Sequence, residues 1–224
     1  MPEPTVNVLE WDTTGQKFFE TGLDKVALFV YDAEGKKYAP PVAWSGVTAV
    51  NESPSGAEEN PLYADNTKYL SIRGVEQFGA TIEAYMWPNE FEECDGTASV
   101  KPGMTIGQQK RKMFGLAYRT CVGNDVEYEN HAYKIHIIYG ATASPSERSY
   151  ATINENPEAG TFSWQLSTTP VNVSGFKPTS TVVLDSRKVK PETMKKIEDA
   201  LYGTTEKAGS LLLPDEIKAL FGEV

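Results

Sequence analysis

Hydrophobic and polar residues alternate in several short runs along this chain. Between residues 80 and 86, Ile82, Ala84 and Met86 alternate with more polar residues. A period of two directs one set of side chains to each face, as in a strand with one buried face. Runs rich in β-branched and aromatic residues, separated by turn residues, predict about nine strands. We place them at residues 26–31, 42–51, 68–73, 80–86, 112–122, 133–143, 149–153, 161–168 and 179–184.

Helical patterns occur at three places. Pro88 is followed by several acidic residues, which predicts a short helix over residues 88–94, because proline and acidic side chains favour a first helical turn. Apolar residues at helical spacing predict a second helix over residues 191–202, ended by Gly203. A third predicted helix covers residues 214–221, where three apolar residues share one face.

These elements predict a mainly β fold with one domain. No alternation of strands and helices is visible, so a parallel α/β sheet is not expected. We predict a polar N-terminal arm over residues 1–20, a β-sandwich or barrel-like domain over residues 21–186, and a helical C-terminal appendage of the same domain over residues 187–224. Residues 52–61 have almost no hydrophobic content and predict a surface loop; residues 103–107 and 154–160 predict turns.

The charge balance narrows the classes of partner. The chain has 224 residues with 21 basic and 31 acidic side chains, a formal net charge of −10. A surface this acidic repels phosphate, so tight nucleic-acid binding is not expected, although DNA as a sliding cargo is compatible with it. No signal peptide and no apolar run of about 20 residues is visible, which predicts folding in a cytoplasm and no membrane insertion.

Candidate chemistry is sparse. The two histidines, His131 and His136, have no cluster of Cys, Asp or Glu beside them at metal-ligand spacing. We interpret Cys94 and Cys121 as small hydrophobic residues rather than reactive thiols. Neither a nucleophile-elbow motif nor a phosphate-binding loop occurs. We therefore expect no catalytic residue, no metal and no cofactor, which favours a structural or binding role.

Several strings of this sequence are informative when they are taken in order: residues 44–58, 62–70, 78–85, 90–96, 106–109, 114–119, 133–140, 162–164 with 168–170, and 213–216. In this order they resemble the major tail proteins of siphophages. None of them is a catalytic signature, and their joint order carries the resemblance, which extends from about Thr21 to Phe221.

The resemblance implies a tail-tube-type β-sandwich or barrel with a flanking helix. Proteins of this family form hexameric rings that stack into a long, non-contractile tube. Strands of six subunits join around a channel for the tape-measure protein and then for DNA. Tail-terminator, tail-tip and assembly-chaperone proteins are the implied partners, and the implied location is the virion tail, assembled in the host cytoplasm.

Two sets of residues are candidates for assembly roles. Residues 52–61 are a candidate stacking element between rings, with Glu52, Ser53, Ser55, Glu58 and Glu59 as its polar members. A plain surface loop explains this segment equally well.

The strand at residues 161–168 alternates a wholly polar set with core residues. This predicts a polar face lining the channel, made of Thr161, Ser163, Gln165 and Ser167 with Thr81 and Glu83. An ordinary solvent-facing sheet has the same pattern, and residues 42–51 and 68–73 compete for the channel role.

Three rival functions remain open. A monomeric β-sandwich that binds sugar or peptide would present exposed aromatic residues, for which Tyr85, Trp87 and Phe91 are candidates. The inner-tube protein of a contractile injection machine would be surrounded by a sheath protein. An enzyme would need carboxylates that converge from distant segments of the chain.

Overall fold

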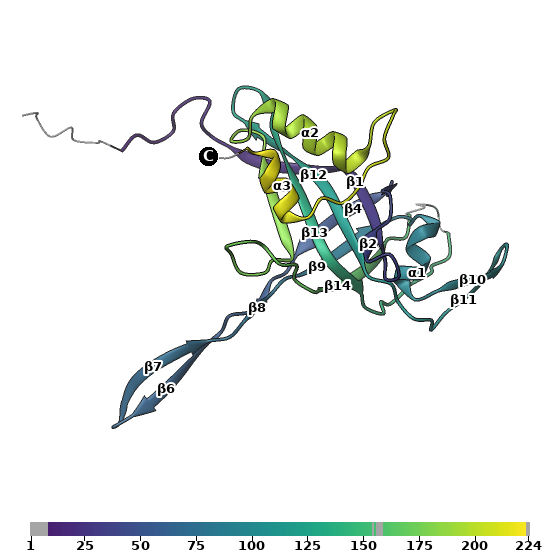
Figure 1. The fold of residues 1–224 in the computed structure, drawn as a ribbon, viewed down its shortest axis with the longest axis horizontal. Helices are drawn as coiled ribbons and strands as arrows, with labels where there is room; N and C mark the ends of the chain where they lie inside the picture. Colours follow the sequence, from purple (N-terminus) through teal and green to yellow (C-terminus); the bar gives the residue numbers. More distant parts are fainter. Residues whose placement is uncertain (1–8, 154, 156–158, 223–224) are drawn as a thin grey trace, which may run out of the picture.

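One antiparallel sheet organises the structure, a computed structural model that describes residues 9–153, 155 and 159–222 (Figure 1). The main path of the sheet is β2-β1-β12-β13-β14-β9-β4, with β15 also paired to β13 and β3 to β1. Its strands are β1 (Phe19–Asp32), β2 (Lys37–Tyr38), β3 (Val42–Ala43), β4 (Val47–Glu52), β9 (Gly79–Ala84), β12 (Phe114–Asn124), β13 (Tyr128–Ala143), β14 (Phe162–Thr168) and β15 (Thr181–Asp185). The predicted mainly β fold is confirmed.

The sheet curls until its two ends are joined by the chain. β3 pairs with β1 near one end, and β4 pairs with β9 at the other. Only residues 44–46 separate β3 from β4, and Gly46 makes the turn between them with φ of +87°. The predicted strand over residues 42–51 is therefore divided into two strands. Residues 42–52 therefore pair with β1 through β3 and with β9 through β4, and so connect the two ends of a barrel-like sheet.

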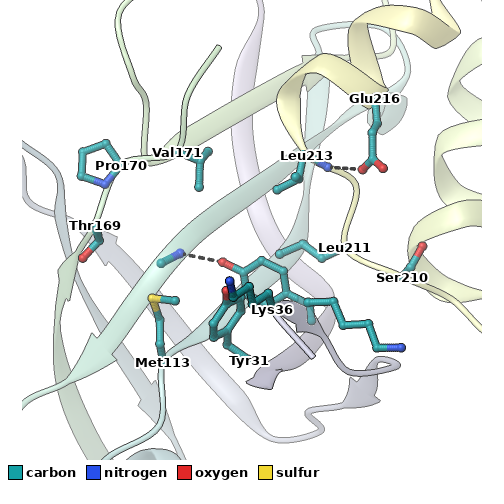
Figure 2. A pocket seen from close by; sticks show the side chains of 13 residues that line it. Tyr31, Lys36, Met113, Thr169, Pro170, Val171, Ser210, Leu211, Leu213 and Glu216 are labelled. Carbon is teal, nitrogen blue, oxygen red and sulfur yellow. Dashed lines mark hydrogen bonds between the residues drawn. The ribbon is translucent and has the colours of Figure 1, made fainter. Parts of the chain in front are cut away.

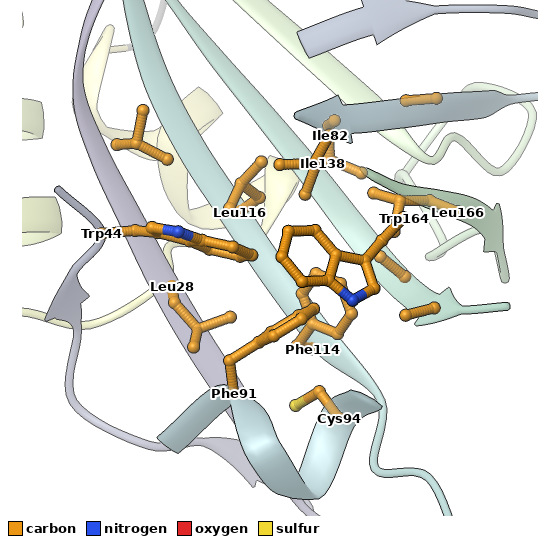
Figure 3. Packing of buried hydrophobic residues seen from close by; sticks show 14 of the residues in the cluster. Leu28, Trp44, Ile82, Phe91, Cys94, Phe114, Leu116, Ile138, Trp164 and Leu166 are labelled. Atoms are coloured by element: carbon orange, nitrogen blue, oxygen red, sulfur yellow. The ribbon is translucent and has the colours of Figure 1, made fainter. Parts of the chain in front are cut away.

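The interior of the curled sheet is filled by aromatic and aliphatic side chains (Figure 3). Trp164 is fully buried and lies against Phe91, with ring centroids 5.2 Å apart. Phe91 belongs to a 3-10 turn (Asn89–Phe91) that runs into α1 (Glu92–Asp95), which confirms the short helix predicted after Pro88. The Asp95 carboxylate accepts a 2.9 Å hydrogen bond from the Trp164 indole. This short helix thus packs against the core, and its residue Asp95 is a buried hydrogen-bond acceptor for the Trp164 indole.

Two C-terminal helices cover one outer face of the sheet. α2 (Pro191–Tyr202) and α3 (Pro214–Leu220) confirm the two predicted helices. Their buried residues form a second apolar cluster with the outward side chains of β1, β12, β13 and β15. The segment predicted as a C-terminal appendage therefore packs against the sheet and contributes to the second apolar cluster of the domain. Among the described residues, no helix is long and apolar enough to cross a bilayer.

A two-stranded ribbon projects from the barrel, where the sequence predicted a surface loop over residues 52–61 (Figure 1). The chain continues from β4 through β5 (Ser55–Gly56) and β6 (Glu59–Ala64), turns, and returns through β7 (Thr67–Arg73) and β8 (Glu76–Gln77) to β9. The loop prediction is wrong because this segment forms strands that pair with residues 71–77. These strands pack against no core, so the segment lacks the hydrophobic pattern of a strand. We call residues 53–78 the ribbon; at about 3.3 Å per residue each side spans roughly 40 Å.

Three smaller predictions need correction. Residues 149–153 form no strand, and Tyr150 and Ile153 are largely exposed, so this run has no buried face. The expected turn at residues 103–107 is mostly strand: β10 (Ala98–Lys101) pairs with β11 (Met104–Ile106). β1 begins at Phe19, inside the predicted N-terminal arm, of which residues 1–8 lie outside the described residues. Most of the predicted turn at 154–160 lies outside them as well.

Candidate assembly surfaces

The polar residues predicted to line a channel share one outer face of β9 and β14. Ser163 pairs with Glu83 and Gln165 with Thr81, while Trp164 pairs with Ile82 on the buried face. Thr161 lies one residue before β14, and the other three predicted residues of this segment lie within the strand. All four are exposed, whereas Thr81 and Glu83 of β9 are half-buried. The register therefore brings the predicted set together on a single surface.

The neighbouring strand β4 extends this polar face. Asn51 lies opposite Thr81, and its side-chain amide donates a 3.2 Å hydrogen bond to Glu83. One of the two competing predictions for the channel, residues 42–51, thus contributes to the same face. The other, residues 68–73, lies in the ribbon. We define the polar face as Asn51, Thr81, Glu83, Thr161, Ser163, Gln165 and Ser167; Glu83 is its one charged member.

The ribbon has one apolar face that no part of the described chain covers. Leu62 pairs with Leu70, and Ile72 lies two residues further along the same face. Their exposed fractions are 42%, 40% and 56%. The opposite face carries Glu59 and Arg73, which pair with each other across the strands. A two-stranded ribbon by itself is only marginally stable in water.

The apolar face was missed from sequence, although a signal for it exists. The apolar residues flank the dipeptide Asp65-Asn66, whose φ angles are +50° and +61°. Two successive residues with positive φ form the tight turn that matches the twist of a two-stranded hairpin. A short polar turn dipeptide between two runs that contain leucine and tyrosine predicts such a hairpin.

The residues predicted to contact an adjacent ring divide into two groups. Ser53, Ser55, Glu58 and Glu59 follow one strand of the ribbon from its root toward its tip. Glu52 ends β4 instead, and its carboxylate accepts a 2.6 Å hydrogen bond from the Tyr118 hydroxyl inside the same chain. Glu52 therefore fixes the root of the ribbon, and the Ser53 amide still donates a 2.8 Å hydrogen bond to Gly79 of β9. Ser55, Glu58 and Glu59 lie further out along the ribbon.

A polar cluster built around His136 lies at this root. The His136 ring stacks on Tyr118 at a centroid distance of 4.8 Å, and its Nδ1 atom is 3.6 Å from Glu52 Oε1. Its Nε2 atom lies 3.0 Å from the Thr120 hydroxyl and 3.3 Å from Glu20 Oε1. The cluster links the start of β1 to the end of β4. Within the described residues, no group of three or more His, Cys, Asp or Glu side chains is arranged to hold a metal ion.

Both carboxylates of this cluster have lowered pKa values. The His136 imidazole, followed by the Tyr118 hydroxyl, lowers the pKa of Glu52 despite its partial burial. Burial alone would raise the pKa of Glu20, but hydrogen bonds, chiefly from Lys134, outweigh it and the pKa is lowered. Each carboxylate therefore binds a proton less readily in the folded chain than in the unfolded chain.

We expect this cluster to make stability depend on pH in the acidic range. The stabilisation is complete above the ordinary glutamate pKa of 4.5 and is lost as the pH falls through the lower folded-state values. Glu52→Gln should therefore flatten the decline in the free energy of unfolding between about pH 5 and about pH 3. Urea unfolding at several pH values measures this. Glu58→Gln, on the exposed ribbon, is the matched control, and equal pH profiles for the two variants would contradict the assignment.

The aromatic residues of the rival binding-module hypothesis do not form a common exposed groove. Phe91 is completely buried, and Trp87 lies beneath the Arg148 guanidinium, whose central carbon is 4.7 Å from the ring centroid. Tyr85 is the exposed member, at 51%. The groove expected of these three residues is therefore not present.

No family model matches this chain, and no curated protein matches it. The structure itself defines a class: a curled β-sheet domain with helices on one outer face, a bare polar face on β4, β9 and β14, and a projecting ribbon. The resemblance to siphophage major tail proteins stays a prediction from the sequence strings.

Proposed function

We propose that this protein is the structural subunit of a bacteriophage tail tube. Six copies form a ring, and rings stack into a hollow tube that conducts the tape-measure protein and then DNA. The polar face is the observation that supports this proposal most directly. It belongs to a barrel whose other outer face is covered by helices, and it offers hydroxyl and amide groups with a single carboxylate.

The chemistry of the polar face suits a channel for a polyanion. Lysine or arginine side chains on a channel wall would hold DNA phosphates, and the polar face has neither. Six copies at −10 each carry roughly sixty negative charges per ring, and the Glu83 carboxylate that each copy places on the polar face repels DNA from the wall. DNA is therefore non-specific cargo in this proposal, and the subunit carries out no catalytic step.

The partners follow from this assignment. They are other copies of the chain, the tape-measure protein inside the tube, and the terminator and tip proteins at its ends, all in the virion tail after assembly in the host cytoplasm. Finding a sheath protein around the tube in the parent particle would instead identify the chain as the inner tube of a contractile machine.

Negative-stain microscopy of the purified protein over a range of concentrations and salt tests the proposal. We expect rings or hollow tubes at high concentration, and the same chain in bulk in the tail of a phage particle. A chain that stays monomeric under every condition, and that no particle contains in quantity, would overturn the assignment.

Adding positive charge to the polar face should slow DNA passage. We expect Ser163→Lys with Gln165→Lys to leave tubes intact but to delay DNA ejection, because lysines on the wall attract phosphates. Fluorescence of a DNA-binding dye during triggered ejection measures the delay. Thr205→Lys with Ala208→Lys adds the same charge in the exposed connection after α2 and should leave ejection unchanged. Unchanged ejection in the first variant would place the polar face outside the channel.

A further inference from the structure

A groove on the helix-covered side of the domain has the chemistry to receive the ribbon (Figure 2). Its volume is about 440 Å³, and it lies between the β1–β2 connection, residues 169–171 and the segment that leads into α3. Its apolar lining comes from Tyr31, Met113, Val171, Leu211 and Leu213. Leu213 is 41% exposed at the rim, so an apolar surface stays open to solvent in the single chain.

The floor and rim of this groove are fixed by internal contacts. The Tyr38 hydroxyl accepts a 3.1 Å hydrogen bond from the Gly140 amide, which holds the tyrosine across the base. The Glu216 carboxylate accepts a 2.7 Å hydrogen bond from the Leu213 amide and so caps the start of α3. Lys36 and Lys37, in contrast, form no salt bridge within the described residues. The groove is thus preformed, with two available positive charges beside it.

We infer that the apolar face of the ribbon of one copy docks into this groove of a second copy. Apolar surface is then removed from water on both sides: Leu62, Leu70 and Ile72 on the ribbon, and the groove lining opposite them. This inference rests on the proposed function, because it names the surface through which the rings or their stacks are joined.

Charge selects this groove among those on the described surface. The ribbon carries four acidic and two basic side chains and is therefore negative. The groove has two lysines and one glutamate, which gives it a positive balance. A larger groove of about 660 Å³ beside α1 has four acidic side chains and one lysine, and would repel the ribbon. Two smaller grooves, near α2 and near His131, have no positive excess when histidine is neutral.

The geometry favours a second copy over the chain's own ribbon. The ribbon leaves the barrel and points away from it, and every residue of β6 is exposed (Figure 1). A projection and a groove at different places on one surface make a heterologous contact, which repeats from copy to copy. Such a contact closes into a ring or continues as a stack, and both arrangements occur in a tube.

Disulfide trapping between two differently tagged chains tests the inference. Both chains carry Cys121→Ser, which removes the partly exposed thiol. One then carries Leu70→Cys on the ribbon and the other Leu213→Cys at the groove. Because a disulfide needs α-carbons within about 7 Å, a linked heterodimer reports this contact specifically. Ser99→Cys, in the acidic groove, replaces Leu213→Cys in the matched control.

We expect mild oxidation to link L70C to L213C and to leave L70C with S99C unlinked. Tubes that form while L70C and L213C stay unlinked would overturn the inference and leave the proposed function standing. Linked heterodimers that never extend into rings or tubes would support the inference and contradict the proposed function. Absence of both products would overturn both.

A charge reversal provides a second readout that needs no new thiol. Lys36→Glu with Lys37→Glu should raise the concentration needed for assembly by about tenfold at low salt, as exposed charge pairs allow. Adding Glu58→Lys and Glu76→Lys on the ribbon should restore assembly. A reversal that has no effect, or that the ribbon changes do not rescue, would count against the groove as the docking site.

Discussion

Replacing Leu62, Leu70 and Ile72 by serine should abolish assembly while the barrel stays folded. Fully burying an aliphatic side chain contributes about 1.5–3 kcal/mol. These three side chains are already partly shielded in the single chain, so their docking contributes about 3 kcal/mol together. A loss of that size weakens each contact about a hundredfold. Because the contact repeats in every copy, polymerisation should fail at concentrations where the unmodified chain forms tubes.

We expect the stability of the barrel to be unaffected by this triple substitution. The three side chains lie on the ribbon, outside both apolar clusters of the domain. Thermal unfolding should therefore give an unchanged midpoint, while sedimentation and microscopy show a monomer. If the midpoint falls by many degrees, the ribbon contributes to the core in a way that the structure does not show.

A second hairpin supplies a matched control. Val100, Met104 and Ile106 on β10 and β11 are apolar, equal in number and similarly exposed, at 53%, 53% and 39%. Their replacement by serine removes comparable apolar surface from a different projection. If this control blocks assembly as strongly as the ribbon variant, general surface apolarity rather than ribbon docking drives association.

The elements that could be predicted from the sequence are those that bury one face in a core, because burial imposes a regular spacing of apolar residues. The alternation around Ile82 and the helical spacing around Ile197 exist because each element packs one face against a buried cluster, and both predictions are confirmed. The shared surface of Ser163 and Gln165 was found for the same reason, since the buried residues between them fix the orientation of the strand.

The returning strand of the ribbon was predicted at residues 68–73, but the outgoing strand was missed because it packs against no core. Glu59 pairs with Arg73 through backbone hydrogen bonds that any sequence can make, so the polar side chains there carry no period-two signal. A strand whose two faces are both exposed looks like a loop in a hydrophobic pattern. The outgoing segment is a strand only because it pairs with the returning segment. This pairing cannot be predicted from the residues of either segment alone.

The polar cluster at the ribbon root was beyond sequence reasoning for a different reason. Glu20, Glu52 and His136 come from three strands, and only the register of the folded sheet brings them together. No carboxylate cluster stands beside His136 in the sequence, because its two carboxylate neighbours lie 116 and 84 residues away along the chain. Local patterns contain no information about such distances.

Trp164→Ala should be the most destabilising single change in the barrel. The side chain is 1% exposed and contacts the rings of Trp44, Trp87 and Phe91. Replacing a buried tryptophan by alanine costs about 3–5 kcal/mol, a large part of the roughly 5–15 kcal/mol that stabilises a domain. Urea unfolding should show a correspondingly lower midpoint. Trp11→Ala, at a site 73% exposed, is the control and should change stability by less than about 0.5 kcal/mol.

Trp164→Phe separates packing from hydrogen bonding at the same site. Phenylalanine keeps most of the ring but cannot donate to Asp95, a carboxylate that is 7% exposed. Asp95 keeps its ion pair with Arg148 in this variant. The loss is therefore that of one hydrogen bond to a charged group, about 1.5–3 kcal/mol, and W164F should fall between the unmodified chain and W164A. Its effect should extend to the polar face, because Trp164 fixes the inward side of β14 while Ser163 and Gln165 occupy the outward side. Hydrogen exchange of β14 and β9 amides should therefore rise in W164F, and unchanged exchange would show that the strand is held by its backbone pairing rather than by this tryptophan.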